Sequence, residues 1–276
     1  MGRSKKSRGK ADAPVSEAQR RRRFSFAAAA LGLVLLVGIG TAGWLLLIGG
    51  GGSASGTKSA IIVDQLSLSQ PNPDFISSAR RLLGEAGYSV EYIQGERVTV
   101  DFYRTLPQRG NDLVILRVHA GITTEVDVSS GERTETEYVS LFTGEAYSRG
   151  KYADEELNRV GRATYSEGAD PLFGIGPEFV RRSMEGTFDD AVIVMMGCDG
   201  LRSRTTAEAF LEKGASDFVS WSQPVSASHT DAATERLLEN LLLAGLSTPE
   251  AVSRTAEEVG PDPTYGGELR VISNGG

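Results

Sequence analysis

The sequence contains very few of the side chains on which many folds and enzyme mechanisms depend. Its 276 residues include one cysteine and two histidines. A single cysteine excludes an intramolecular disulfide and any zinc site built on several cysteines. A mechanism that needs an imidazole must use His119 or His229. The 33 glycines follow no three-residue period, which excludes a collagen-like fibre.

The rest of the composition is that of an ordinary globular protein. Hydrophobic residues make up 40% of the chain and charged residues 24%, which argues against a wholly disordered chain or a polytopic membrane protein. The length suits one large domain or two small ones.

Positive and negative charges are unevenly distributed along the chain. Residues 1–23 hold nine Lys or Arg and two acidic residues, whereas the remainder holds 20 basic and 34 acidic residues. A basic tail on an acidic body can indicate nucleic-acid binding. The segment that follows the tail favours another interpretation, and we expect no nucleic-acid partner.

No charged residue occurs from Phe24 to Thr57, and residues 24–48 are almost entirely apolar. A helix of that length spans about 37 Å, enough to cross a bilayer core. Trp44 suits an interfacial anchor, and the Arg20–Arg23 cluster keeps the N-terminus in the cytoplasm. We therefore predict a single-pass signal anchor in the lipid bilayer, with the C-terminal part extracytoplasmic. Cleavage by a peptidase within residues 49–59 remains an alternative.

Four segments follow from this pattern. We expect a disordered basic cytoplasmic tail at 1–23, a transmembrane helix at 24–48, a flexible Gly/Ser linker at 49–58 and a folded domain at 59–276.

The folded domain opens with an alternation of strands and helices. We expect strands at 59–65, 88–93 and 112–119, and helices at 73–87 and 99–106. This order is typical of an open, mostly parallel sheet covered by helices, which is an α/β fold.

The second half is less regular at first. Residues 122–150 are rich in Thr, Val, Glu and Tyr and predict an inserted β-hairpin that turns near Ser129. After the hairpin we expect a Gly/Pro-rich loop around 171–177 and a series of helices and strands. The expected helices are 154–165, 178–184, 205–214, 230–244 and 248–259, and the expected strands are 190–197, 217–221 and 268–272.

His119 and Cys198 occupy equivalent places in this pattern. Each ends an apolar strand, and each is followed two residues later by a glycine, Gly121 or Gly200. Ligands of open α/β sheets bind beyond the carboxyl ends of the strands. The two side chains can therefore meet there although they are 79 positions apart. A cysteine beside a histidine is the arrangement that thiol catalysis requires.

Backbone groups beside the pair can serve the same chemistry. The N–H groups of Cys198 and of Ala120 or Gly121 are candidates for an oxyanion hole. Taken singly, a cysteine at a strand end is usually a small buried apolar residue. The paired placement is what favours catalysis.

At these residues the sequence resembles the caspase-like cysteine peptidases of clan CD, which include caspases, gingipains, clostripain, separase and the bacterial CHAT domains. The resemblance lies in DLVILRVHAG, in DAVIVMMGCDG and in the downstream stretch 207–252, which is most similar to CHAT domains. It implies a three-layer sandwich, a catalytic His119 and Cys198, and cleavage after a residue held in a pocket. Ala120 and Gly197 depart from the usual glycine and alanine of that pattern.

Other positions are weaker candidates for binding substrate. Ser220, Trp221 and Ser222 lie in a region that the resemblance associates with the substrate groove. Asp64 follows the first strand and Asp199 follows the cysteine, so both can face the same sheet edge. His229 precedes a helix beside capping residues and is a poorer catalytic candidate.

Together these features predict a membrane-anchored, extracytoplasmic cysteine endopeptidase that acts on a protein or peptide substrate. We expect no cofactor and no metal ligated by cysteine and histidine clusters. A calcium site in a loop remains an alternative, because its carbonyl and carboxylate ligands carry no clear sequence pattern. Two alternatives also remain, a catalytically inactive relative that serves as a surface binding or sensor domain, and a flavodoxin-like ligand-binding domain.

Overall fold

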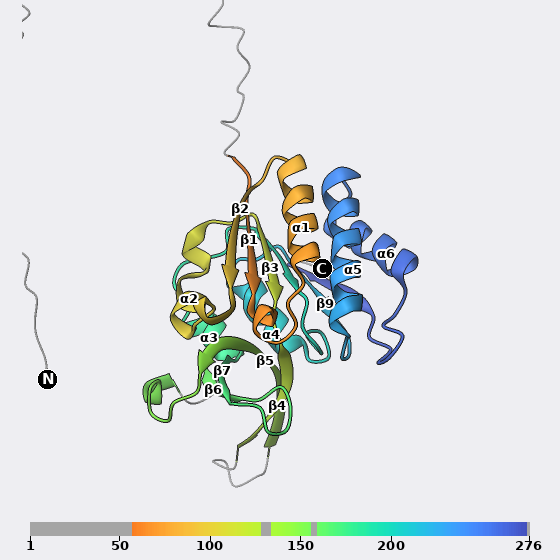
Figure 1. Cartoon of the computed structure of the whole chain (residues 1–276). Coiled ribbons are helices and arrows are strands. Elements are labelled where there is room, and N and C mark those ends of the chain that lie inside the picture. Colours follow the sequence, from red (N-terminus) through yellow and green to blue (C-terminus); the bar gives the residue numbers. More distant parts are fainter. Residues whose placement is uncertain (1–56, 128–133, 156–158, 275–276) are drawn as a thin grey trace, which may run out of the picture. The chain divides into compact units, whose positions relative to one another are not determined.

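A six-stranded, mostly parallel sheet forms the centre of the part of the chain that the structure, a computed structural model, describes, namely residues 57–127, 134–155 and 159–274. Only β10 runs antiparallel to its neighbour (Figure 1). Across the sheet the strands are β2 (Ser89–Gln94), β1 (Ser59–Asp64), β3 (Leu113–Arg117), β8 (Val192–Met195), β9 (Asp217–Trp221) and β10 (Leu269–Ser273).

Helices cover both faces of this sheet, because its strands are apolar on both sides. One face packs against α1 (Pro73–Glu85), α5 (Ala227–Leu238) and α6 (Thr248–Val259), which lie together in Figure 1. The other packs against α2 (Val100–Thr105), α3 (Pro177–Arg182) and α4 (Arg204–Glu212). Along β1, Ala60 and Ile62 belong to the first core, and Ile61 and Val63 to the second. The prediction of a mostly parallel α/β sheet is confirmed.

Local signals explain where the longer helices begin. The Asn72 side chain accepts a hydrogen bond from the backbone of Phe75, and Pro73 occupies the first turn of α1. At α6, Ser247 and Glu250 form a capping box. Short turns of 3₁₀ helix lie at Gln65–Leu68, Gly95–Arg97, Pro107–Arg109 and Ala153–Glu155, and a π-helical turn, Glu239–Leu243, follows α5.

A second, antiparallel sheet follows β3. Its strands, in spatial order, are β4 (Ala120–Asp127), β5 (Thr134–Ala146), β7 (Leu172–Ile175) and β6 (Val160–Ala163). The predicted hairpin is confirmed by the pairing of β4 with β5, while its expected turn near Ser129 lies outside the described residues.

Two expectations for the following stretch are wrong. Instead of a helix at 154–165, the chain has a 3₁₀ turn at Ala153–Glu155 and then β6, and the expected loop at 171–177 contains β7. The buried residues Val160 and Ala163 are three positions apart, a spacing that suits a helix, yet the stretch pairs with β7 and Gly161 faces Gly174. The strand forms by pairing with another strand, so the local sequence pattern does not predict it.

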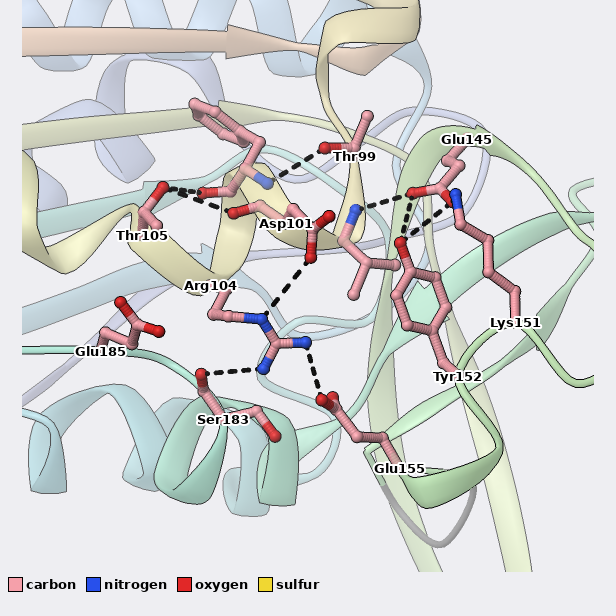
Figure 2. Close-up of polar contacts among 12 residues, drawn as sticks. Thr99, Asp101, Arg104, Thr105, Glu145, Lys151, Tyr152, Glu155, Ser183 and Glu185 are labelled. Carbon is pink, nitrogen blue, oxygen red and sulfur yellow. Dashed lines mark hydrogen bonds and ion pairs between the residues drawn. The ribbon is translucent and has the colours of Figure 1, made fainter.

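A polar network ties the second sheet to the helical layer (Figure 2). Arg104 of α2 donates to Glu155 at 2.7 Å, and Glu145 of β5 accepts from the backbone N–H of Val100 at 3.1 Å. Lys151 and Tyr152 also contact the Glu145 carboxylate. These contacts fix both ends of the segment that leads from β5 towards β6.

The expected membrane segment falls outside this description. Within the described residues no helix is both long and apolar enough to cross a bilayer. The tail at 1–23, the expected span at 24–48 and most of the linker at 49–58 lie outside the described residues.

Candidate active site

The site lies at the carboxyl ends of two adjacent central strands. β3 and β8 run side by side with Leu116 opposite Met195, and the N–H of Met196 donates to the carbonyl of Leu116 at 2.9 Å. Gly197 then passes so close to Val118 that a Cβ would lie 2.5 Å from the Val118 oxygen. The next residues along the two strands are His119 and Cys198, which the close approach brings to one edge of the sheet.

His119 and Cys198 line the same cavity, which has a volume of about 400 Å³. Its other lining residues come from the ends of β3 and β8, from the segment after β1, from the loop after β9, from the start of α5 and from two tyrosine-bearing loops. They are Leu66, Gln70, Val118, Tyr165, Met196, Gly197, Pro224, Val225, Ser226, Ala227, Thr230 and Tyr265. A cavity of this size suits a side chain or a small ligand. The two residues therefore line one cavity beyond the strand ends.

The His119 imidazole is held from several sides. Its backbone N–H donates to Gln65 Oε1 at 2.9 Å, and Nε2 shares a hydrogen bond with Ser69 Oγ at 2.9 Å. Tyr165 stacks on the ring, with centroids 4.9 Å apart and planes 5° from parallel. Burial lowers the pKa of His119, and the positive charge of Arg117 lowers it further. The imidazole is therefore neutral at pH 7.

The Cys198 thiol is half-buried and donates to the carbonyl of Val225 at 3.5 Å. Burial raises its pKa, and the negative charges of Asp199 and Asp262 add to this shift. Among the hydrogen bonds of the described residues, none joins Cys198 to His119. At rest the pair is a neutral thiol and a neutral imidazole facing one cavity, each with another partner.

The candidate oxyanion donors differ in orientation. The N–H of Phe142 donates to the His119 carbonyl, and Ala120 and Gly121 then pair with β5. Hydrogen bonds alternate along an antiparallel ladder, so the N–H of Gly121 turns towards β5 and that of Ala120 turns away from it. Ala120 also lies against Gly197. The N–H groups of Ala120 and Cys198 are therefore better placed to act together than that of Gly121.

The candidates at the end of β9 and directly after it are committed to packing. Ser220 is fully buried and donates to the Met195 carbonyl at 2.6 Å. The indole of Trp221 donates to Thr230 at 2.9 Å, and Ser222 bonds to the backbone of Glu268. None of the three lines the cavity. The structure thus places them behind the site, where Trp221 supports the cavity residue Thr230.

Asp199 turns the chain after the cysteine. Its φ of +60° lies in the left-handed region, which aspartate tolerates better than most residues. Its side chain is buried, Oδ1 has no hydrogen-bond partner, and Arg202 lies 3.8 Å away. Burial raises the pKa of Asp199, and Arg202 opposes that shift. The residue does not line the cavity.

Asp64 belongs to a buried ionic cluster beneath the site. Arg117, fully buried on β3, donates to Asp64 at 2.8 Å and to both oxygens of Asp231 at 2.8 and 2.9 Å. Arg117 also donates to the Gln70 carbonyl at 2.9 Å, which holds the segment that carries Ser69. Asp64 is therefore paired with Arg117 and, contrary to the expectation, does not line the cavity.

Several residues of the site are not predicted from the sequence. Arg117 carried a signal, since a charged residue inside the apolar run DLVILRVH implies a buried partner. Ser69 and Tyr165 lie in loops and carried none. Across the described ranges, no group of three or more histidine, cysteine or carboxylate side chains is arranged to hold a metal ion.

Comparison with known proteins adds no relative. No family model matches this chain, and no curated protein matches it.

Proposed function

We propose that this protein is a cysteine endopeptidase in which Cys198 is the nucleophile and His119 the general base. One observation carries the proposal: two residues 79 positions apart, one of them the sole cysteine of the chain, line a single cavity at the carboxyl ends of adjacent parallel strands. The sequence resemblance to caspase-like peptidases supports it, since it implies the same two residues at the same two strand ends. Residues 24–48 and Arg20–Arg23 favour an extracytoplasmic site on a membrane anchor.

The chemistry needs only groups that the site contains, plus water. The thiol proton passes to His119, and the sulfur attacks the carbonyl carbon of the scissile peptide bond. Backbone N–H groups at Ala120 and Cys198 then stabilise the negative oxygen of the tetrahedral intermediate. When this intermediate collapses, the C–N bond breaks and the amine leaves with the proton from His119. Water, deprotonated by His119, hydrolyses the thioester and regenerates the thiol.

The resting contacts must change before this sequence begins, because the thiol donates to Val225 and, within the described part of the chain, no hydrogen bond joins it to His119. The Nε2 atom of His119 is bonded to Ser69. Breaking such hydrogen bonds costs about 1 kcal/mol each, an amount that substrate binding supplies readily. The resting arrangement is therefore compatible with activity that begins when substrate enters the cavity.

The same resting contacts favour a second candidate function. In a catalytically inactive relative, Ser69 and Tyr165 would hold His119 permanently, and the cavity would only bind a ligand. The two candidates differ in whether Cys198 reacts as an activated thiol, which His119 should control in the peptidase alone.

A single experiment separates these candidates. The full-length protein, Cys198→Ala and His119→Ala are incubated with a mixed peptide library, and products are identified by mass spectrometry. In parallel, a thiol electrophile such as iodoacetamide labels the sole cysteine. The peptidase predicts cleavage by the wild type alone and slower labelling in His119→Ala. Absence of cleavage together with labelling that His119→Ala leaves unchanged would support the binding domain and exclude the peptidase.

A further inference from the structure

The cavity beside Cys198 has an apolar wall. Leu66, Val118, Met196 and Val225 line it, and each is at most 7% exposed. Among the described lining residues none carries a charge when His119 is neutral. A side chain that enters this space meets these carbon and sulfur atoms together with the polar groups of Gln70, Tyr165 and Tyr265, and it meets no charge.

The aliphatic hydroxyl groups on the wall, those of Thr230 and Ser226, are already engaged. Thr230 Oγ1 donates to the carbonyl of Met196 at 3.0 Å and accepts from the Trp221 indole. Ser226 Oγ donates to Asp262 at 2.7 Å. Neither hydroxyl proton is free for a ligand, so these residues do not compensate a charged or strongly polar side chain.

The charges behind the wall are negative and satisfied. Asp262 accepts hydrogen bonds from Ser226, Thr264 and Tyr265. Burial favours the neutral form of Asp262, but these hydrogen bonds outweigh it and lower its pKa to about 2. Arg117 is balanced by the carboxylates of Asp64 and Asp231, which leaves that cluster with an excess negative charge. An acidic side chain would be repelled, and a basic one would find no carboxylate on the wall to pair with.

We propose that this cavity receives an uncharged, largely apolar side chain, borne by the residue whose carbonyl carbon Cys198 attacks. This substrate class rests on the proposed peptidase function for its chemistry, but the binding preference itself is a property of the wall. Burying an unpaired charge there costs far more than burying an apolar group of equal size. Discrimination against aspartate and arginine should therefore reach about tenfold or more in kcat/KM.

The first test measures specificity. Fluorogenic tetrapeptides that differ only at the residue before the leaving group, carrying Leu, Met, Asp or Arg, are given to the full-length protein. We expect kcat/KM for Leu and Met to exceed that for Asp and Arg by about tenfold or more. Preferred cleavage after Asp or Arg would overturn the assignment of the cavity while leaving the peptidase function intact.

A variant of the wall sharpens this test. Ala227 lines the cavity in the first turn of α5, where an acidic residue is favoured by the helix dipole. Ala227→Asp should raise the kcat/KM for the Arg substrate relative to that for the Leu substrate by about tenfold. Ala227→Asn, whose side chain has the same shape as aspartate but no charge, should leave this ratio unchanged. Equal ratios in the two variants would contradict the placement of the side chain in this cavity.

Binding can be measured without catalysis. N-acetyl-leucine amide, N-acetyl-aspartate and N-acetyl-arginine amide are compared as protectants of Cys198 against iodoacetamide. Protection by the leucine compound alone, with no peptide cleaved, would support the cavity preference and overturn the peptidase. Equal or stronger protection by a charged compound, or none by the leucine compound, would overturn the preference itself.

Discussion

Gly197 faces Val118 so closely that a Cβ on the glycine would lie 2.5 Å from the Val118 carbonyl oxygen and 2.9 Å from the Ala120 Cβ. Neither obstacle is the flexible end of a long side chain. The strand that ends in Cys198 can therefore approach the strand that ends in His119 only because residue 197 has no side chain. Alanine, common at this position in the peptidases that the sequence resembles, does not fit here.

Gly197→Ala should therefore separate the two strand ends. We expect it to lower the free energy of unfolding by about 1–3 kcal/mol and to reduce peptidase activity by at least about tenfold, because Cys198 moves relative to His119. Urea denaturation followed by tryptophan fluorescence measures the first effect, since Trp221 is buried. Peptide hydrolysis measures the second.

Gly84→Ala is the matched control. It makes the same chemical change in α1, where a Cβ would meet nothing within 4 Å. Alanine is preferred in helices, so this variant should be more stable by about 0.5–1 kcal/mol. A Gly197→Ala protein as stable and as active as Gly84→Ala would contradict the close approach.

The charge state of the pair predicts a pH profile. Burial raises the pKa of the Cys198 thiol, and burial, with a further contribution from Arg117, lowers the pKa of His119. Both shifts favour the neutral pair at pH 7. Because only the thiolate reacts, alkylation of the folded protein should rise about tenfold per pH unit from pH 7 to 9 without reaching a plateau.

The unfolded chain provides the control for this profile, since it holds the same single cysteine. In urea the alkylation rate should reach half its maximum at about pH 8.5, the ordinary pKa of a cysteine, and should level off about one pH unit above it. A preformed thiolate–imidazolium pair would behave differently, with an alkylation rate nearly constant from pH 5 to 8. Observing that plateau in the folded protein would refute the neutral resting state.

The sequence predicted the parts of this site that depend on regular strands. DLVILRVH and DAVIVMMGC are long apolar runs, so their ends, and with them His119 and Cys198, could be located. β6 and β7 could not be, because four-residue strands acquire their conformation from distant partners. Ser69 and Tyr165 reach His119 from loops, where side-chain direction depends on tertiary contacts. The position of Asp64 at a strand end was predicted, but its carboxylate binds Arg117 and does not line the cavity.

The buried ionic cluster should dominate the stability of the site. Arg117→Met leaves Asp64 and Asp231 without their cation in the interior. We expect a loss of about 3–5 kcal/mol in the free energy of unfolding, measured by urea denaturation. Arg109→Met is the control, because the Arg109–Glu91 pair is partly exposed and such pairs contribute at most about 1 kcal/mol. Similar losses in the two variants would show that burial of the Arg117 cluster does not matter.

Tyr165 provides a direct test of the His119 environment. Its ring covers one face of the imidazole, and burial is the main cause of the lowered pKa of His119. Tyr165→Ala should expose the ring and move this pKa up towards the ordinary 6.5, whereas Tyr165→Phe keeps the stacked ring and should leave the pKa low. Proton NMR titration of the imidazole resonances measures this shift, and because the chain has two histidines, a His229→Gln variant assigns the signals.

The same variants connect the pKa to stability. A histidine whose pKa is lower in the folded than in the unfolded protein resists protonation in the folded state, so stability decreases as the pH falls below about 6.5. Tyr165→Ala should weaken this dependence on pH, and Tyr165→Phe should preserve it. If the two variants titrate alike, the stacked ring does not shield His119, and the lowered pKa must come from the cavity wall and from Arg117 alone.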